Sequence, residues 1–193
     1  MKIKLGVIFG GISVEHEVSV ISAIQAMKHI DSNRYDIIAI YITKDGEWYT
    51  GDMLKDIKIY SDMDLLKRYA KPVVLYKDDN RFILQSKSFL KREVEELDIC
   101  FPIMHGTNGE DGSLQGYLET IGIPYCESDH YASVLGQDKI FMKQIWASCG
   151  VPIVKYEWFF DIEYQSNSDK IVEKIEKLGY PVIVKPVNLG SSV

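Results

Sequence analysis

The sequence has few cysteines, and their spacing does not indicate disulfide pairs. Its three cysteines, Cys100, Cys126 and Cys149, stand far apart and form no CxxC motif. An odd number of widely spaced cysteines argues against a disulfide framework, and no His or Cys pair has the spacing of zinc ligands. We therefore expect reduced thiols in a cytoplasmic protein without a zinc site.

The sequence also lacks long apolar runs and clusters of positive charge. No apolar stretch approaches the ~20 residues of a membrane-spanning helix. Met1 is followed by Lys2-Ile3-Lys4 and an apolar segment that ends at Gly10-Gly11, which is too short for a signal peptide. The 22 basic residues face 28 acidic ones, for a net charge of −6, and no Lys/Arg-rich run stands out. We therefore expect neither a membrane nor a nucleic acid as partner.

The composition is that of a globular protein. Of the 193 residues, 46% are hydrophobic and 26% are charged, which is sufficient to form a core. Short apolar runs alternate with segments of helical periodicity, and this alternation predicts an α/β fold with a mostly parallel, open sheet. Strands are expected over 3–9, 35–42, 73–76, 81–84 (the last two as a hairpin), 97–104 and 123–126, and helices over 17–27, 114–121 and 133–148.

A second unit is expected after Gly150-Val151-Pro152. Strands over 154–160 and 181–185 flank a helix over 169–178, and no further element follows to close the unit. We therefore expect a first domain over 1–131 and a truncated second domain over 132–193.

The segment 10–19, GGISVEHEVS, joins the first strand to the first helix. Ligands of open α/β sheets bind at the carboxyl ends of strands, and glycines beside a helix N-terminus suit a carboxylate. Glu15 could receive a substrate ammonium there. The alternative is that Ser13 caps the helix and the acids complement its dipole. Neither GxGxxG nor a P-loop is present, which argues against a dehydrogenase.

The segment 105–112, HGTNGEDG, leaves another strand end. Its three glycines favour close approach of a ligand, and His105 can donate to a carboxylate or phosphoryl oxygen. The alternative is a surface turn with a solvated pair of acids.

Two lysines are candidates for binding an anion. Lys185 ends an apolar strand and precedes Gly190-Ser191-Ser192, which favours phosphate binding. The alternative is an edge lysine that extends into solvent. Lys139 lies at the edge of an apolar helical stripe, so its ammonium can leave the core.

Together these segments resemble the D-alanine–D-alanine ligases, members of the ATP-grasp superfamily. Four of them occur in family order: GGISVEHEVS (10–19), HGTNGEDGSLQG (105–116), Gln137-Asp138-Lys139 and PVIVKPVNLGSSV (181–193). The resemblance implies a Rossmann-like, pre-ATP-grasp first domain followed by the start of an ATP-grasp central domain. It also implies synthesis of D-alanyl-D-alanine through an acyl phosphate, for peptidoglycan precursors.

The resemblance assigns roles by position. Glu15 matches the acid that binds the ammonium of the first D-alanine, and Ser191 matches the serine that bonds with it. His105, with Gly106, matches the histidine beside that alanine's carboxylate, while Lys139 and Lys185 match the lysines that hold ATP phosphates. The ligands of Mg²⁺ or Mn²⁺ are expected beyond Val193. The family also suggests a homodimer through the first domain.

Several alternatives stay open. The second substrate can be D-alanine, D-serine or D-lactate, because relatives that make each product share these motifs. A different ATP-grasp enzyme, or a non-catalytic amino-acid sensor on this scaffold, are further readings. The segment 126–130, CESDH, replaces small residues and glycine usual in the family, and Gln137 replaces a common methionine.

Overall fold

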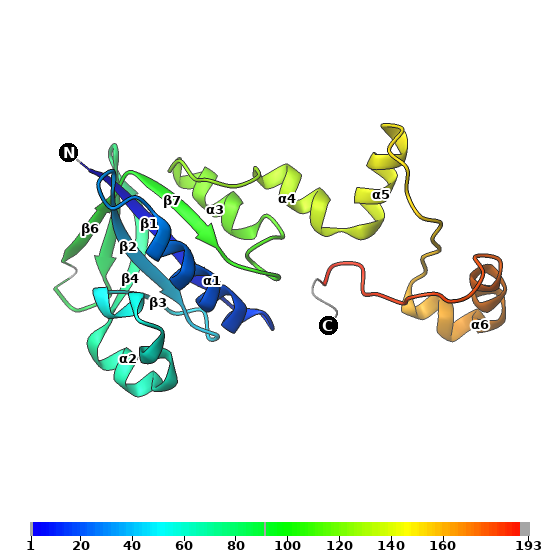
Figure 1. The fold of residues 1–193 in the computed structure, drawn as a ribbon, viewed down its shortest axis with the longest axis horizontal. Coiled ribbons are helices and arrows are strands. Elements are labelled where there is room, and N and C mark those ends of the chain that lie inside the picture. The colour runs from blue at the N-terminus through cyan, green and yellow to red at the C-terminus, as the bar shows by residue number, and fades with distance from the viewer. Residues whose placement is uncertain (1, 91, 190–193) are drawn as a thin grey trace. The chain divides into compact units, whose positions relative to one another are not determined.

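The computed structural model describes residues 2–90 and 92–189. The chain forms two compact units, the first up to Val134 and the second from Leu135. Figure 1 labels most of the helices and strands of the two units. No helix in the described part of the chain is long and apolar enough to cross a membrane.

The first unit is built on one seven-stranded sheet, with the strand order β6-β5-β4-β3-β2-β1-β7. Its strands are β1 (Ile3–Gly10), β2 (Tyr35–Ile42), β3 (Trp48–Thr50), β4 (Lys71–Asp78), β5 (Arg81–Ser86), β6 (Glu93–Leu97) and β7 (Ile99–Ile103). Its helices are α1 (His16–His29), α2 (Met63–Tyr69) and α3 (Ser113–Ile121), with 3-10 turns at Asp52–Lys55 and Ile57–Ser61; α4 (His130–Gln137) contains the division between the units.

The α/β class is confirmed, but the prediction of a mostly parallel sheet is wrong. Among the named strands of the described residues, the parallel pairs are β1 with β2 on one side and β1 with β7 on the other. The pairs β2–β3, β3–β4, β4–β5 and β5–β6 are antiparallel. A parallel pair needs a long crossover, which α1 supplies between β1 and β2, whereas tight turns such as that between β4 and β5 produce hairpins.

The core lies on both faces of this sheet. Side chains of β1 alternate between the two faces: Phe9 packs with the α1 residues Val20 and Ile24, whereas Ile8 packs with Leu118 of α3. Helices on both faces explain why β1 and β2 are nearly continuous apolar runs. Because β1 is packed on both faces, its position in the sheet is fixed. The loop that follows its carboxyl end therefore starts from a fixed point.

Three other predicted elements have different outcomes in the structure. The hairpin at 73–84 is confirmed by β4 and β5. The strand expected over 123–126 is reduced to a single bridge between Cys100 and Tyr125. The helix expected over 133–148 is divided into α4 and α5 (Lys139–Ser148), because the carboxylate of Asp138 accepts from the amides of Ile140 and Phe141 and caps a new helix.

The second unit contains α5 and α6 (Asp161–Glu176). The expected helix begins earlier than predicted, and its backbone is interrupted at Asn167 (φ −157°, ψ 58°). The strands expected over 154–160 and 181–185 are wrong, because the described residues there belong to no strand. A strand requires hydrogen-bonding partners, and an apolar run alone does not provide them.

Candidate functional site

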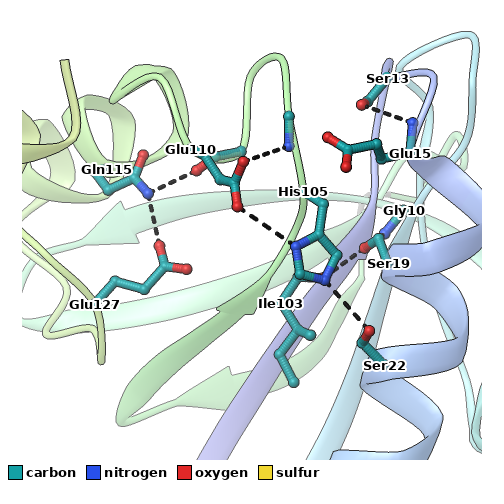
Figure 2. A network of polar contacts seen from close by, with 12 residues as sticks. Gly10, Ser13, Glu15, Ser19, Ser22, Ile103, His105, Glu110, Gln115 and Glu127 are labelled. Atoms are coloured by element: carbon teal, nitrogen blue, oxygen red, sulfur yellow. Dashed lines mark hydrogen bonds and ion pairs between the residues drawn. The ribbon is translucent and has the colours of Figure 1, made fainter. Parts of the chain in front are cut away.

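Two loops emerge side by side from the sheet, because β1 and β7 are parallel neighbours with Phe9 opposite Ile103. Gly106 has a φ of +70°, and a Cβ atom there would lie 2.7 Å from both Glu15 Oε2 and Ser13 Oγ. Only glycine permits so close an approach in that conformation. The fold therefore brings Glu15 and Gly106 together at the carboxyl ends of adjacent strands, with His105 next to them (Figure 2).

The loop that carries Glu15 is held by its own backbone. The Ser13 amide donates to the Gly11 carbonyl (3.1 Å), and the His16 amide donates to the Ser13 carbonyl (3.2 Å). The Ser13 hydroxyl accepts from the Glu15 amide (3.1 Å). Glu15 is half-buried and precedes α1, yet its side chain caps no helix amide. Within the described residues its carboxylate accepts no hydrogen bond, so it remains available to a ligand.

The buried side chain of His16 connects the same loop to strand β2. The ring is 5% exposed, with Nδ1 2.8 Å from the Gly11 carbonyl and Nε2 2.9 Å from the Tyr41 hydroxyl. A carbonyl only accepts, so the hydrogen lies on Nδ1, and Nε2 accepts from Tyr41. Burial raises the pKa of Tyr41 to about 12, which keeps this hydroxyl protonated. His16 thus donates a hydrogen bond to the Gly11 carbonyl and keeps it in place.

Ser19 joins the ends of the two strands. Its hydroxyl accepts from the Gly10 amide (2.8 Å) and donates to the Ile103 carbonyl (2.5 Å). Ser22, one helical turn further along α1, lies 3.3 Å from His105 Nε2. Sequence reasoning did not single out either serine as a site residue. Their three-residue spacing on one helix face was the available signal.

His105 lies between α1 and the glycine-rich loop. Its Nδ1 is 3.5 Å from Glu110 Oε1, and the Gly106 amide donates to Glu110 Oε2 at 3.0 Å. Burial opposes ionisation of Asp111, but hydrogen bonds from the backbone of Asn108 and Ser113 outweigh it and lower the pKa of Asp111. Both acids of this loop therefore organise its backbone, unlike the solvated pair of a simple surface turn.

Gln115 and Glu127 extend this network, and sequence reasoning did not name them as site residues. Gln115 Nε2 donates to the Gly109 carbonyl (2.7 Å) and to Glu127 Oε2 (2.6 Å). Burial, aided by the negative charge of Glu110, raises the pKa of Glu127. Figure 2 shows Gln115 between Glu127 and the loop that carries Glu110. The only sequence signal was the unusual segment 126–130.

The candidate phosphate residues lie in the second unit. Lys139 Nζ donates to the carbonyls of Val187 (3.1 Å) and Leu189 (2.5 Å), which places it against the segment that follows Lys185. An ammonium has three donors, so one remains for a phosphate oxygen. Lys185 is exposed, and the hydrogen bonds of the Lys139 ammonium go to Val187 and Leu189. Ser191 lies outside the described residues.

The described residues, 2–90 and 92–189, contain no group of three or more His, Cys, Asp or Glu side chains placed to hold a metal ion. The two loops instead combine the carboxylate of Glu15, as an acceptor, with the imidazole ring of His105. Such an arrangement suits a small zwitterion, which needs an acceptor for its ammonium and donors for its carboxylate.

Comparison with known proteins points to one family. The model of the D-ala D-ala ligase N-terminus matches residues 4–128, and that of the C-terminus matches 145–193. The D-alanine–D-alanine ligases of Thermosipho melanesiensis and Geobacillus kaustophilus are 39% and 38% identical over 99% and 100% of this chain. These matches cover 51% and 52% of the two relatives, so the chain spans about half of their length.

Solved structures agree with these sequence matches. The D-alanine–D-alanine ligase of Coxiella burnetii is 31% identical with a TM-score of 0.86, over 100% of this chain and 53% of that one. The VanG D-Ala:D-Ser ligase of Enterococcus faecalis is 34% identical with a TM-score of 0.78, over 100% of this chain and 54% of that one. With its N-terminal family model matched over 4–128, the chain belongs to the D-alanine–D-alanine ligase family.

Proposed function

We propose that the full-length protein joins two D-alanines to D-alanyl-D-alanine and hydrolyses ATP to ADP and phosphate in the process. Here the full-length protein means this chain extended to the length of its relatives. The reaction passes through an acyl phosphate of the first D-alanine and serves peptidoglycan precursor synthesis. The observation that carries this proposal is the Glu15 carboxylate beside Gly106, which accepts no hydrogen bond from the described residues and lies at adjacent strand ends of a chain from this family.

In this proposal the first D-alanine binds between the two loops. Its ammonium pairs with Glu15, whose carboxylate has no competing donor in the described residues. Its carboxylate lies beside His105, which Glu110 and Ser22 hold in place, and beside Gly106. The Gly106 amide already donates to Glu110, so Gly106 contributes space and close approach more than a hydrogen bond.

The phosphates of ATP are assigned to Lys139 and Lys185. Lys139 is oriented by two backbone carbonyls and keeps one donor, which suits neutralisation of phosphate charge. Phosphoryl transfer depends mainly on positioning and charge neutralisation, and Mg²⁺ or Mn²⁺ supplies further positive charge when bound. Ligands for such an ion are expected beyond residue 193. Ser191, matched by position to the family's serine, is proposed as a catalytic residue of the full-length protein.

A second candidate is a D-alanine–D-serine ligase. It is favoured by the VanG structure, which is more similar to this chain in sequence than the Coxiella ligase is (34% against 31%). Both reactions begin with the same first D-alanine, so the residues described above serve either one.

The test is product analysis with the purified full-length protein. ATP, Mg²⁺ and an equimolar mixture of D-alanine and D-serine are supplied, and dipeptides are identified by mass spectrometry while ADP release is followed. We expect D-alanyl-D-alanine as the main product and no ADP with L-alanine as control. A dominant D-alanyl-D-serine product would favour the second candidate, and absence of ADP release with either amino acid would refute both.

The remaining assignments concern the whole protein. We propose a substrate-binding domain over 1–131 and an ATP-grasp domain that begins at 132, supported by the compact units that divide at Val134. We also propose a cytoplasmic homodimer that associates through the first domain. Gel filtration with light scattering tests the dimer, and a monomeric mass at micromolar concentration would refute it.

A further inference from the structure

Glu127 reaches the glycine-rich loop through one intermediary. Its carboxylate accepts from Gln115 Nε2 (2.6 Å), and the same nitrogen donates to the Gly109 carbonyl (2.7 Å). Gln115 is 1% exposed, so its bond to the Gly109 carbonyl is shielded from water, while the carboxylate of Glu127 is in part exposed to solvent. A single carboxamide therefore connects the segment after Tyr125 to the loop that carries His105 and Gly106 (Figure 2).

The orientation of this carboxamide depends on Glu127. Both partners of Nε2 are acceptors, so a half-turn of the amide would set Gln115 Oε1 against two oxygens. In the observed orientation Oε1 is buried without a hydrogen-bond partner in the described part of the chain, which is unfavourable. A charge-assisted bond to a carboxylate is about twice as strong as a neutral one and offsets this cost. Without Glu127, the observed orientation loses that advantage.

The position of Glu127 is unfavourable for its own ionisation. Burial and the charge of Glu110 both oppose its negative charge, and the bond from Gln115 only partly compensates. A carboxylate kept in such surroundings contributes more to local order than to overall stability, as residues of functional sites often do. The matching gain is the ordered backbone of the loop, where the amides of Gly109 (3.1 Å) and Glu110 (2.9 Å) donate to the Gly106 carbonyl.

We propose that Glu127 is a positioning residue, which fixes the Gln115 carboxamide and through it the Gly109 carbonyl and the loop 105–112. The proposal rests on the proposed function only in taking this loop as part of the first amino-acid site. It assigns a role to the segment 126–130, which the family motifs do not explain.

The test is hydrogen exchange in the full-length protein without ligand, read at the amides of Gly109 and Glu110. Glu127→Ala should accelerate exchange there about tenfold, because a hydrogen bond to a charged group is lost. Exchange in the β1–β2 pair should stay at the wild-type rate. Glu127→Gln keeps the shape and an acceptor, and should accelerate exchange about threefold; it also serves if the Ala variant does not fold.

Two further variants establish that Glu127 acts through Gln115. In a Gln115→Met background, the added Glu127→Ala change should alter exchange at Gly109 less than twofold. The matched control is Glu93→Ala, since Glu93 of β6 contacts Arg81 (3.3 Å) and lies in a strand that does not carry the loop. This control should leave exchange at Gly109 unchanged.

A functional readout separates positioning from general stability. Glu127→Gln should weaken first-site D-alanine binding about threefold, leave the KM for ATP unchanged, and raise the melting temperature at pH 7. Wild-type exchange at Gly109 in Glu127→Ala, or an undiminished effect in the Gln115→Met background, would overturn the proposal. Because exchange is measured without substrate, it supports or overturns the role of Glu127 even if the protein proves not to be a ligase.

Discussion

Replacing Glu15 by Gln in the full-length protein tests the assigned ammonium partner most directly. The change keeps the shape of the side chain and removes its charge. A charge-assisted hydrogen bond contributes about 1.5–3 kcal/mol, so first-site D-alanine affinity should fall by about one to two decades, at ~1.4 kcal/mol per decade. The melting temperature should change little, because this carboxylate accepts no hydrogen bond from the described residues.

Glu17 provides a matched control for this experiment. It lies in the first turn of α1 and is subject to the same helix dipole, but its exposed carboxylate pairs with Lys44 (2.5 Å), which lowers the pKa of Glu17. Glu17→Gln should therefore keep wild-type D-alanine affinity and lose at most about 1 kcal/mol of stability. Calorimetry of D-alanine binding and thermal melting of both variants complete the comparison.

The opposite pattern would refute the reasoning. If Glu15 only complements the helix dipole, Glu15→Gln should lower the melting temperature slightly, like Glu17→Gln, and keep wild-type affinity. Wild-type D-alanine binding by Glu15→Gln removes Glu15 as the ammonium anchor, whatever its stability.

Four other outcomes are expected. Gly106→Ala should destabilise the protein by about 1–2 kcal/mol in denaturant titrations, since its φ is +70° and the Cβ would meet Glu15 and Ser13, whereas Gly136→Ala, with open space around it in α4, should not destabilise it. His16→Asn keeps a donor near the Nδ1 position and should retain D-alanine affinity, whereas His16→Leu should lose about tenfold; equal losses in calorimetry would refute the role of the Nδ1 bond. Lys185→Ala should raise the KM for ATP and leave D-alanine affinity unchanged, and unchanged ATP kinetics would favour a solvent-exposed edge lysine. Burial raises the pKa of Glu127 in the folded protein above its value of about 4.3 in the unfolded chain. The stability of the wild type is therefore greatest below this unfolded-state pKa and falls as the pH rises through the folded-state pKa. Glu127→Gln should have a higher melting temperature than the wild type at pH 7, and the difference should vanish near pH 4.

The sequence predicted the parts of the fold whose signal is local. Strands β1 and β2 are buried on both faces, which makes them continuous apolar runs, and the β4–β5 hairpin has a polar turn between two such runs. The antiparallel part of the sheet depends on β3, Trp48–Thr50, whose three residues have no measurable periodicity. The strands predicted in the second unit are wrong, because a strand needs a neighbouring strand to pair with, and an apolar run in the sequence does not show whether one is present.

Some residues of the candidate site were also predicted from the sequence, and others were not. Glu15, His105 and Gly106 were predicted at strand ends, and the parallel pairing of β1 with β7 brings their loops together. Their roles toward a substrate stay predictions. Ser19 and Gln115 escaped notice because each acts by a bond to backbone that is distant in sequence or hidden in a turn. Nothing in a serine's own neighbourhood indicates that it will bond to a carbonyl 84 residues away.

Strand β6 ends the strand order, so one of its sides carries backbone donors and acceptors that no neighbouring strand of this sheet uses. Three of its five residues are glutamates: Glu93, Glu95 and Glu96. Arg81 contacts Glu93 (3.3 Å) and Glu96 (3.9 Å) from β5, which keeps these charges compatible with the sheet. Another strand that approached this edge would have to desolvate carboxylates along its whole length. The charge pattern of β6 therefore disfavours pairing of another strand with this edge of the sheet.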